Sequence, residues 1–211
     1  YLFNLAGHIS HIGSLRDPNH DLELNCSSHL SLLELCRTHN PALKIIYAST
    51  RQIYGRPTYL PVDEKHPLAP VDFNGISKMA GEWYHILYSN VYGIRTCALR
   101  LTNTYGPRMR VKDARQTFLG IWIKNLVEGK RIEVWGDGLQ VRDFNYVDDV
   151  TDAMLMAALS EQSNGQLYNL GSPERVNLKD LAALMIEVHG KGEYAIVPFP
   201  EDRKPIDIGD Y

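Results

Sequence analysis

The sequence predicts an α/β fold built on a mostly parallel sheet. Strand-like and helix-like segments alternate along the 211 residues, which is typical of βαβ units. Several strand-like segments are short, continuous apolar runs, as expected for strands that are covered on both faces. The composition, 44% hydrophobic and 22% charged, is that of an ordinary globular protein.

The first half of the chain contains three strand-like and two helix-like segments. The predicted elements are a strand at 1–6, a helix at 21–38, a strand at 44–49, a helix at 75–91 and a strand at 96–101. A loop rich in His, Ser and Gly is expected after the first strand. Residues 55–72 contain four prolines among polar residues and predict a long loop without regular structure.

The second half continues the alternation. The predicted elements are a helix at 116–128, a strand at 131–135, a helix at 148–159, a strand at 167–170, a helix at 177–188 and a strand at 194–197. Gly129 and Gly190 follow two of these helices and are expected to end them. Asn177 is expected to cap the last helix.

Charge and cysteine usage exclude several classes of protein. The net charge is -3, with Lys and Arg spread along the chain, which argues against a nucleic-acid-binding protein. No apolar run is long enough to cross a bilayer, so no membrane partner is expected. The three cysteines are irregularly spaced, which disfavours a disulfide framework or a zinc site and favours a cytoplasmic location. The eight histidines show no metal-ligand spacing, so no metal is expected.

Five segments carry more specific patterns. They are Asn4-Leu-Ala-Gly7, Tyr47-Ala-Ser-Thr-Arg-Gln-Ile-Tyr-Gly55, Ser77-Lys-Met-Ala-Gly-Glu82, Leu99-Arg-Leu-Thr-Asn-Thr-Tyr-Gly-Pro107 and Gly136-Asp-Gly-Leu-Gln-Val-Arg-Asp-Phe-Asn-Tyr-Val-Asp-Asp149. In this order and spacing they resemble the extended short-chain dehydrogenase/reductase family, of the NAD-dependent nucleotide-sugar epimerase/dehydratase type. The resemblance covers nearly the whole chain.

The resemblance implies a Rossmann-like, doubly wound parallel sheet with a smaller α/β substrate-binding lobe. Residues 1–107 would form part of the NAD-binding domain, including the catalytic helix. Residues 108–211 would form mostly the substrate lobe, with a strand and a helix that return to the sheet. The family's Gly-rich pyrophosphate turn is not found in this sequence. We therefore expect an N-terminally truncated chain, also cut at its C-terminus, that binds NAD poorly by itself.

The resemblance also implies a reaction: a sugar hydroxyl is oxidised by hydride transfer to NAD, or NADP, while a general base takes its proton. The family uses a tyrosine four residues before a lysine, with a nearby Ser or Thr. Lys78 matches the lysine and Thr50 the hydroxyl residue, but the tyrosine position holds Asn74. An amide is no base near neutral pH.

Three explanations of Asn74 stay open. Another group could supply the base, with candidates at Tyr59, His8, His11 and His85. The protein could be a non-catalytic nucleotide-sugar or NAD-binding protein on the same scaffold. The residue could also have been changed by engineering.

The residues after Thr50 bear on the reaction type. Family dehydratases carry an Asp-Glu pair there, and decarboxylases carry a Glu at the second position. This chain has Arg51-Gln52, which favours epimerisation or simple oxidoreduction.

Further site residues follow from the resemblance. Those expected to bind the cofactor are Ala6, Gly7, Asn25, Ser49, Lys78 and Thr102. Those expected to bind the nucleotide sugar are Asn103, Thr117, Phe118, Arg142 and Arg203; a guanidinium suits phosphate oxygens. Family members often pair through two helices, so a homodimer is expected through the helices at 21–38 and 75–91.

Overall fold

A four-stranded parallel sheet forms the centre of the protein. The structure, a computed structural model, describes residues 1–111 and 118–210. Its strand order is β1 (Leu2–Asn4), β2 (Lys44–Thr50), β3 (Arg95–Leu101) and β7 (Gln166–Leu170), and every pairing is parallel. The predicted α/β class is therefore confirmed.

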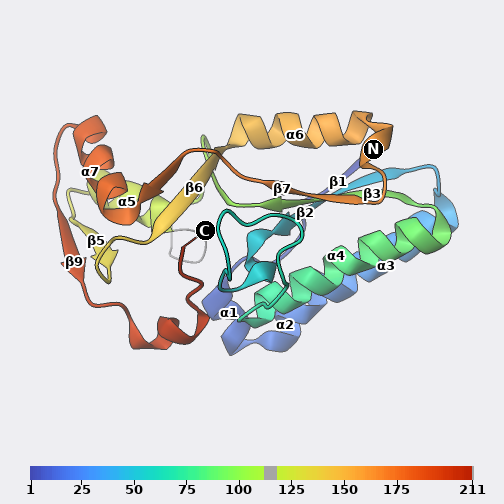
Figure 1. Cartoon of the computed structure of the whole chain (residues 1–211), viewed down its shortest axis with the longest axis horizontal. Coiled ribbons are helices and arrows are strands. Elements are labelled where there is room, and N and C mark those ends of the chain that lie inside the picture. The colour runs from blue at the N-terminus through green and yellow to red at the C-terminus, as the bar shows by residue number, and fades with distance from the viewer. Residues whose placement is uncertain (112–117, 211) are drawn as a thin grey trace.

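Helices cover both faces of this sheet (Figure 1). On one face lie α3 (Ser28–His39) and α4 (Phe73–Tyr92), and on the other lies α6 (Val147–Leu159). Neighbouring residues of β2 point to opposite faces, because side chains alternate along a strand. Ile45 packs with Leu33 and Tyr88, whereas Ile46 packs with Met154 and its neighbours on α6. The sheet is thus doubly wound.

The helical run before α3 contains a wide turn. It comprises α2 (Pro18–Leu22), the π-helical turn η1 (Glu23–Ser27) and then α3. The backbone N–H of Ser28 donates to the carbonyl of Glu23, five residues earlier. The sequence predicted one regular helix at 21–38. That helix begins earlier than predicted and is interrupted.

The loop expected after the first strand contains a helix, α1 (His11–Arg16). Ser10 caps it by accepting a hydrogen bond from the Gly13 N–H at 3.0 Å. The helix is six residues long, too short to show a 3.6-residue apolar period. The loop prediction was wrong here for that reason.

The long helix α4 begins and ends with strong local signals. Asp72 caps it by accepting from the Gly75 N–H at 2.7 Å, and Gly93 ends it in the left-handed conformation. The 3₁₀ turn η2 (Arg51–Tyr54) follows β2, and the predicted irregular loop at 55–72 lies between η2 and α4.

The second lobe has two small sheets and two main helices. One sheet contains β4 (Asn103–Tyr105), β6 (Val141–Tyr146) and β8 (Arg175–Asn177), and the other pairs β5 (Ile132–Trp135) with β9 (Tyr194–Val197). The helices are α5 (Phe118–Val127) and α7 (Leu178–His189), with a short 3₁₀ turn η4 (Glu201–Ile206). Another 3₁₀ turn, η3 (Glu161–Ser163), follows α6 beside the central sheet.

A separate apolar core joins α5, α7 and β5, around Trp122, Ile132 and Ala182. The sequence did not predict β4, β6 or β8, which are short and carry little apolar alternation. The first two residues of the helix predicted at 116–128 lie outside the described residues.

Within the described residues, no helix is long and apolar enough to cross a membrane.

Candidate functional site

A cavity of about 510 Å³ opens where the carboxyl ends of β2 and β3 meet the start of α4. Ligands of open parallel sheets bind at this edge, beyond the carboxyl ends of the strands. Six of the predicted site residues line the cavity: Ser49, Thr50, Asn74, Lys78, Thr102 and Asn103. A second cavity, of about 600 Å³, lies between α5 and α7, and none of the predicted site residues with described positions lines it.

The other predicted residues do not line the 510 Å³ cavity. They are Ala6, Gly7, Asn25, Phe118, Arg142 and Arg203. Thr117 lies outside the described residues.

Lys78 is buried on α4 with its amine toward the end of β2. Its Nζ donates to the carbonyl of Ala48 at 3.2 Å. Burial lowers the pKa of Lys78 to about 8, although the nearby charge of Asp21 acts to raise it. Gly7 borders this amine: a Cβ at position 7 would lie 3.1 Å from Lys78 Nζ and 2.6 Å from Asn25 Oδ1. The missing side chain of Gly7 therefore lets the loop after β1 lie close against Asn25 and Lys78.

The hydroxyls at the end of β2 are both held by the protein. Thr50 Oγ1 accepts from the backbone N–H of Gln52 at 3.2 Å. The Ser49 hydroxyl donates to Glu82 Oε2 at 2.6 Å. Glu82 is in turn paired with the buried guanidinium of Arg100, whose Nε lies 3.0 Å from the same oxygen. This pair braces the wall of the cavity from inside the fold.

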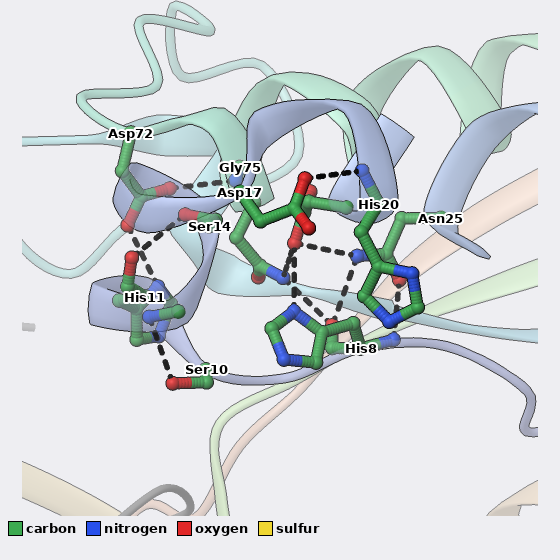
Figure 2. A network of polar contacts seen from close by, with 12 residues as sticks. His8, Ser10, His11, Ser14, Asp17, His20, Asn25, Asp72 and Gly75 are labelled. Carbon is green, nitrogen blue, oxygen red and sulfur yellow. Dashed lines mark hydrogen bonds and ion pairs between the residues drawn. The ribbon is translucent and has the colours of Figure 1, made fainter. Parts of the chain in front are cut away.

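Asn74 occupies the position where the family's tyrosine was expected. It belongs to a polar cluster that also contains His8, Asp21 and Asn25. Its side-chain amide donates to the carbonyl of His8 at 2.7 Å and to Asp21 Oδ2 at 3.1 Å. Asn25 donates to the same two acceptors at 2.9 and 3.1 Å, and His8 Nδ1 lies 3.1 Å from Asp21 Oδ2. Asn74 therefore ties the loop after β1 to α2. Figure 2 shows His8 and Asn25 of this cluster.

A second polar cluster lies beside it (Figure 2). His11 Nδ1 is 2.7 Å from Asp72 Oδ2, and Gln52 Nε2 donates to the same oxygen at 3.2 Å. His11 and Gln52 both line the cavity. The carboxylate that also starts α4 thus holds a histidine at the cavity wall.

The remaining base candidates of the sequence lie elsewhere. Tyr59 is exposed and donates to Asp63 Oδ1 at 2.7 Å, a bond that raises the pKa of its phenol to about 12. His85 is fully buried, and burial lowers its pKa to about 4. Neither residue, nor His8, lines the cavity.

The predicted substrate residues of the second lobe have protein partners. Arg142 donates from Nη1 to the carbonyls of Val141 and Gly209, each at 2.7 Å. The Arg203 guanidinium lies 4.6 Å from the centre of the Trp135 ring. Phe118 packs against the apolar core of this lobe. Asn103, at the cavity, donates to the carbonyl of Asp143 at 3.1 Å.

Several residues of this site were not singled out from the sequence. Asp72 is one, although Asp72-Phe-Asn-Gly75 before an apolar helix is a typical capping pattern. Arg108 and Arg110 bring two further cations to the cavity wall, beside Arg51. No local pattern in the sequence places Arg108 and Arg110 there. In the part of the chain that the structure describes, no group of three or more His, Cys, Asp or Glu is arranged to hold a metal ion.

Comparison with known proteins gives consistent matches. The model of the NAD dependent epimerase/dehydratase family matches residues 1–171. A putative UDP-glucose 4-epimerase of Methanocaldococcus jannaschii is 36% identical, over 83% of this chain and 56% of its own length. The UDP-glucose 4-epimerase of Mycolicibacterium smegmatis is 30% identical, over 85% and 57%. The chain thus spans little more than half of these two relatives.

Solved structures agree with this match. The UDP-glucose 4-epimerase of Thermotoga maritima, solved with UDP-glucose, superposes with a TM-score of 0.90 at 30% identity, covering 100% of this chain and 68% of that one. A UDP-N-acetylglucosamine 4-epimerase of Methanobrevibacter ruminantium superposes with a TM-score of 0.91 at 26% identity, covering 99% and 65%.

Proposed function

We propose that this chain, which belongs to the NAD-dependent epimerase/dehydratase family, comes from an enzyme that epimerises a nucleotide sugar by hydride transfer at a sugar carbon. The observation that carries the proposal is the cavity in which Thr50 and Lys78 meet without a carboxylate following Thr50. The two curated relatives reported above are named as UDP-glucose 4-epimerases. Their names support carbon 4 as the reacting centre.

The residues of the cavity fit a nicotinamide cofactor, which we propose to be NAD. When bound, NAD would supply the hydride acceptor and donor for the sugar carbon. The amine of Lys78 makes one hydrogen bond within the described residues, to the carbonyl of Ala48, and keeps further donors for the hydroxyls of a ribose. Gly7 lets the loop after β1 lie close against this amine, because a Cβ there would meet Asn25 Oδ1 and Lys78 Nζ. Ser49 and Thr102 line the same cavity as Lys78, and we propose that they contact the cofactor. Ala6 and Asn25 are retained as cofactor-binding residues from the sequence.

For the nucleotide sugar, we retain the residues implied by the sequence. Asn103 is at the cavity, and Arg142 and Arg203 carry the charge that would offset a diphosphate. Phe118 stands at the start of α5, and Thr117 is retained from the sequence alone. The corresponding division into a cofactor part at 1–107 and a mainly substrate-binding part at 108–211 is supported by an apolar core that lies wholly in the second part. Another core joins β2 and β3 to α6, as expected for a helix that returns to the first sheet.

A homodimer formed by α3 and α4 is part of the proposal. The exposed side of α4 carries Ile76, Trp83, Leu87 and Val91, and α3 adds Leu35. Apolar side chains gathered on one helical surface are typical of an interface. We also propose a cytoplasmic location, which the three free, buried cysteines support.

The proposal is tested on the full-length protein. Bound nucleotide is released by denaturation and identified by mass spectrometry, and the protein is incubated with UDP-, dTDP-, GDP- and CDP-sugars while NMR detects new epimers. We expect bound NAD and conversion of one of these sugars, with Lys78→Met as the inactive control. Retention of NAD or of a nucleotide sugar with no conversion would instead identify a binding protein, the alternative that Asn74 leaves open.

A further inference from the structure

We propose that His11, oriented by Asp72, is the general base of this site and takes the sugar proton that the family's tyrosine was expected to take. The inference rests on the proposed function and adds a residue to it. Three observations support it. His11 lines the cavity, Asp72 is held as an acceptor for the His11 ring, and both amide hydrogens of Asn74 are bonded within the protein.

The place of His11 sets it apart from the other candidates. Of the four groups weighed from the sequence, it alone lines the cavity that contains Thr50 and Lys78. Its side chain is 39% exposed, whereas the Asp72 side chain behind it is fully buried. A candidate base must be able to reach its substrate, and His11 lies on the wall of the cavity in which we propose that the substrate binds.

The bonds of Asp72 fix the chemical form of the imidazole. Asp72 Oδ1 accepts from the Gly75 N–H at 2.7 Å, and Oδ2 accepts from Gln52 Nε2 at 3.2 Å. Burial alone would raise the pKa of Asp72, but the contacts with His11, Gly75 and Gln52 outweigh it and hold that pKa below its ordinary value.

Asp72 is therefore an ionised acceptor, so the hydrogen between it and His11, across 2.7 Å, belongs to Nδ1. In neutral imidazole the other nitrogen then carries the lone pair. None of the described residues bonds to Nε2 of His11. A histidine held by a buried carboxylate, with its free nitrogen unprotonated, is the arrangement that general bases use.

Asn74 completes the argument. Both hydrogens of its amide have acceptors in the protein, at His8 and Asp21, so the residue acts as a brace of the fold. The proton acceptor that the reaction needs must come from another side chain of the same cavity.

In the proposed step, His11 accepts a proton while the sugar carbon loses a hydride. The O–H bond of the sugar breaks, and its proton bonds to His11 Nε2. The C–H bond of the same carbon breaks, its electron pair passes with the hydrogen to NAD⁺, and a C=O bond forms. The sugar is oxidised to a ketone as NAD⁺ is reduced. Return of the hydrogen to the opposite face reverses both transfers and gives the epimer.

The test compares His11→Gln and Asp72→Asn with His20→Gln, an exposed histidine of α2 outside the cavity. Asparagine is as good a helix cap as aspartate, so Asp72→Asn keeps the cap of α4, but it removes the charge and replaces the oxygen that meets His11 and Gln52 by a donor. We expect kcat to fall by about 10²- to 10⁴-fold in both cavity variants, with KM and bound NAD near wild type. Thermal unfolding should stay near wild type in His11→Gln, the variant that carries the test. His20→Gln should keep the wild-type kcat.

A second readout does not depend on turnover. Long-range ¹H–¹⁵N NMR of the labelled protein reports which nitrogen of each histidine carries the proton. We expect His11 in the Nδ1–H form in wild type, and loss of that form in Asp72→Asn.

The outcomes separate this inference from the function on which it rests. A wild-type protein that turns over a sugar, together with an equally active His11→Gln, overturns the role of His11 and leaves the epimerase intact. An Nε2–H form of His11 in wild type overturns the role as well. Absence of turnover by wild type on every sugar overturns the proposed function and this inference together.

Discussion

The side-chain amide of Asn74 donates a hydrogen bond to the carboxylate of Asp21, 53 residues earlier in the chain, at 3.1 Å. Asp21 is fully buried and one of its oxygens has no other partner in the described residues, so loss of a donor to its second oxygen is expected to be costly. We predict that Asn74→Ala lowers the free energy of unfolding by about 1–3 kcal/mol, measured by urea denaturation. Asn90→Ala, at an exposed position of the same helix, is the control; equal losses in the two variants would contradict the prediction.

The buried pair of Glu82 and Arg100 gives a larger effect. Glu82→Gln removes the charge and turns an acceptor into a donor that faces Arg100 and the Ser49 hydroxyl. We predict a loss of about 3–5 kcal/mol in the free energy of unfolding, because a guanidinium stays buried without its counter-charge. The exposed pair of Glu128 and Lys130 serves as the comparison, and Glu128→Gln should cost less than about 1 kcal/mol. Similar losses at both sites would show that the buried pair is not specially coupled.

Lys78 predicts a pH dependence of stability. Its pKa falls from 10.5 to about 8 in the folded protein because the amine is buried. Between these two values the unfolded chain binds more protons than the folded one, so this lysine makes the free energy of unfolding rise with pH, by about 1.4 kcal/mol per pH unit. Below pH 8 the lysine is charged in both states and adds no slope.

Urea denaturation of wild type and Lys78→Met from pH 7.5 to 10.5 measures this slope as a difference between the two proteins. Lys191→Met, at an exposed lysine, should follow wild type across the whole range. A difference between wild type and Lys78→Met that does not change with pH would refute the assignment of a lowered pKa.

Gly7→Ala tests the space beside Lys78. The added Cβ would lie 2.6 Å from Asn25 Oδ1 and 3.1 Å from Lys78 Nζ, at a positive φ. We predict a loss of at least about 1 kcal/mol of stability together with weaker NAD binding by calorimetry. Gly93 also has a positive φ, but a Cβ added there would meet no atom within 4 Å, so Gly93→Ala isolates the backbone strain, about 1 kcal/mol. NAD binding that survives Gly7→Ala would show that the close packing of this loop against Lys78 is not needed for the cofactor.

Leu87→Glu tests the proposed dimer. Leu87 is an exposed apolar residue of α4, and a carboxylate there would be buried without a partner in the proposed interface. Sedimentation velocity should show a dimer for wild type and a monomer for the variant. Val188→Glu, at an exposed apolar position of α7, should stay dimeric. A monomeric wild type would end the proposal.

The sequence predicted best those elements whose signals are local. The strand β9 (Tyr194–Val197) has the predicted bounds, and α7 is capped by Asn177 and ended by Gly190 as expected. The helix α1 and the strands β4, β6 and β8 were missed, because these segments of three to six residues show neither an apolar run nor a clear alternation. Their stability depends on contacts that are distant in sequence.

The site shows the same division. Motifs of the sequence brought Thr50, Asn74 and Lys78 to notice, and all three line one cavity. The contact between His11 and Asp72 joins residues 61 positions apart, on two helices whose relative placement no local pattern specifies. The sequence named four candidate bases, and only the packing of α1 against α4 distinguishes among them.

The wide turn η1 determines to which side the side chains of α2 and of α3 point. A π turn contains one residue more than an α turn, and each residue of a helix advances it by about 100°. Upstream of η1, Asp21 points to the loop after β1; downstream, Leu33 points to the sheet. Removing one residue from Glu23–Ser27 would restore regular α-helical hydrogen bonding and rotate the upstream segment by about 100°. The extra residue therefore rotates the two parts of this continuous helical run relative to each other, so that each part directs its contacts to a different side.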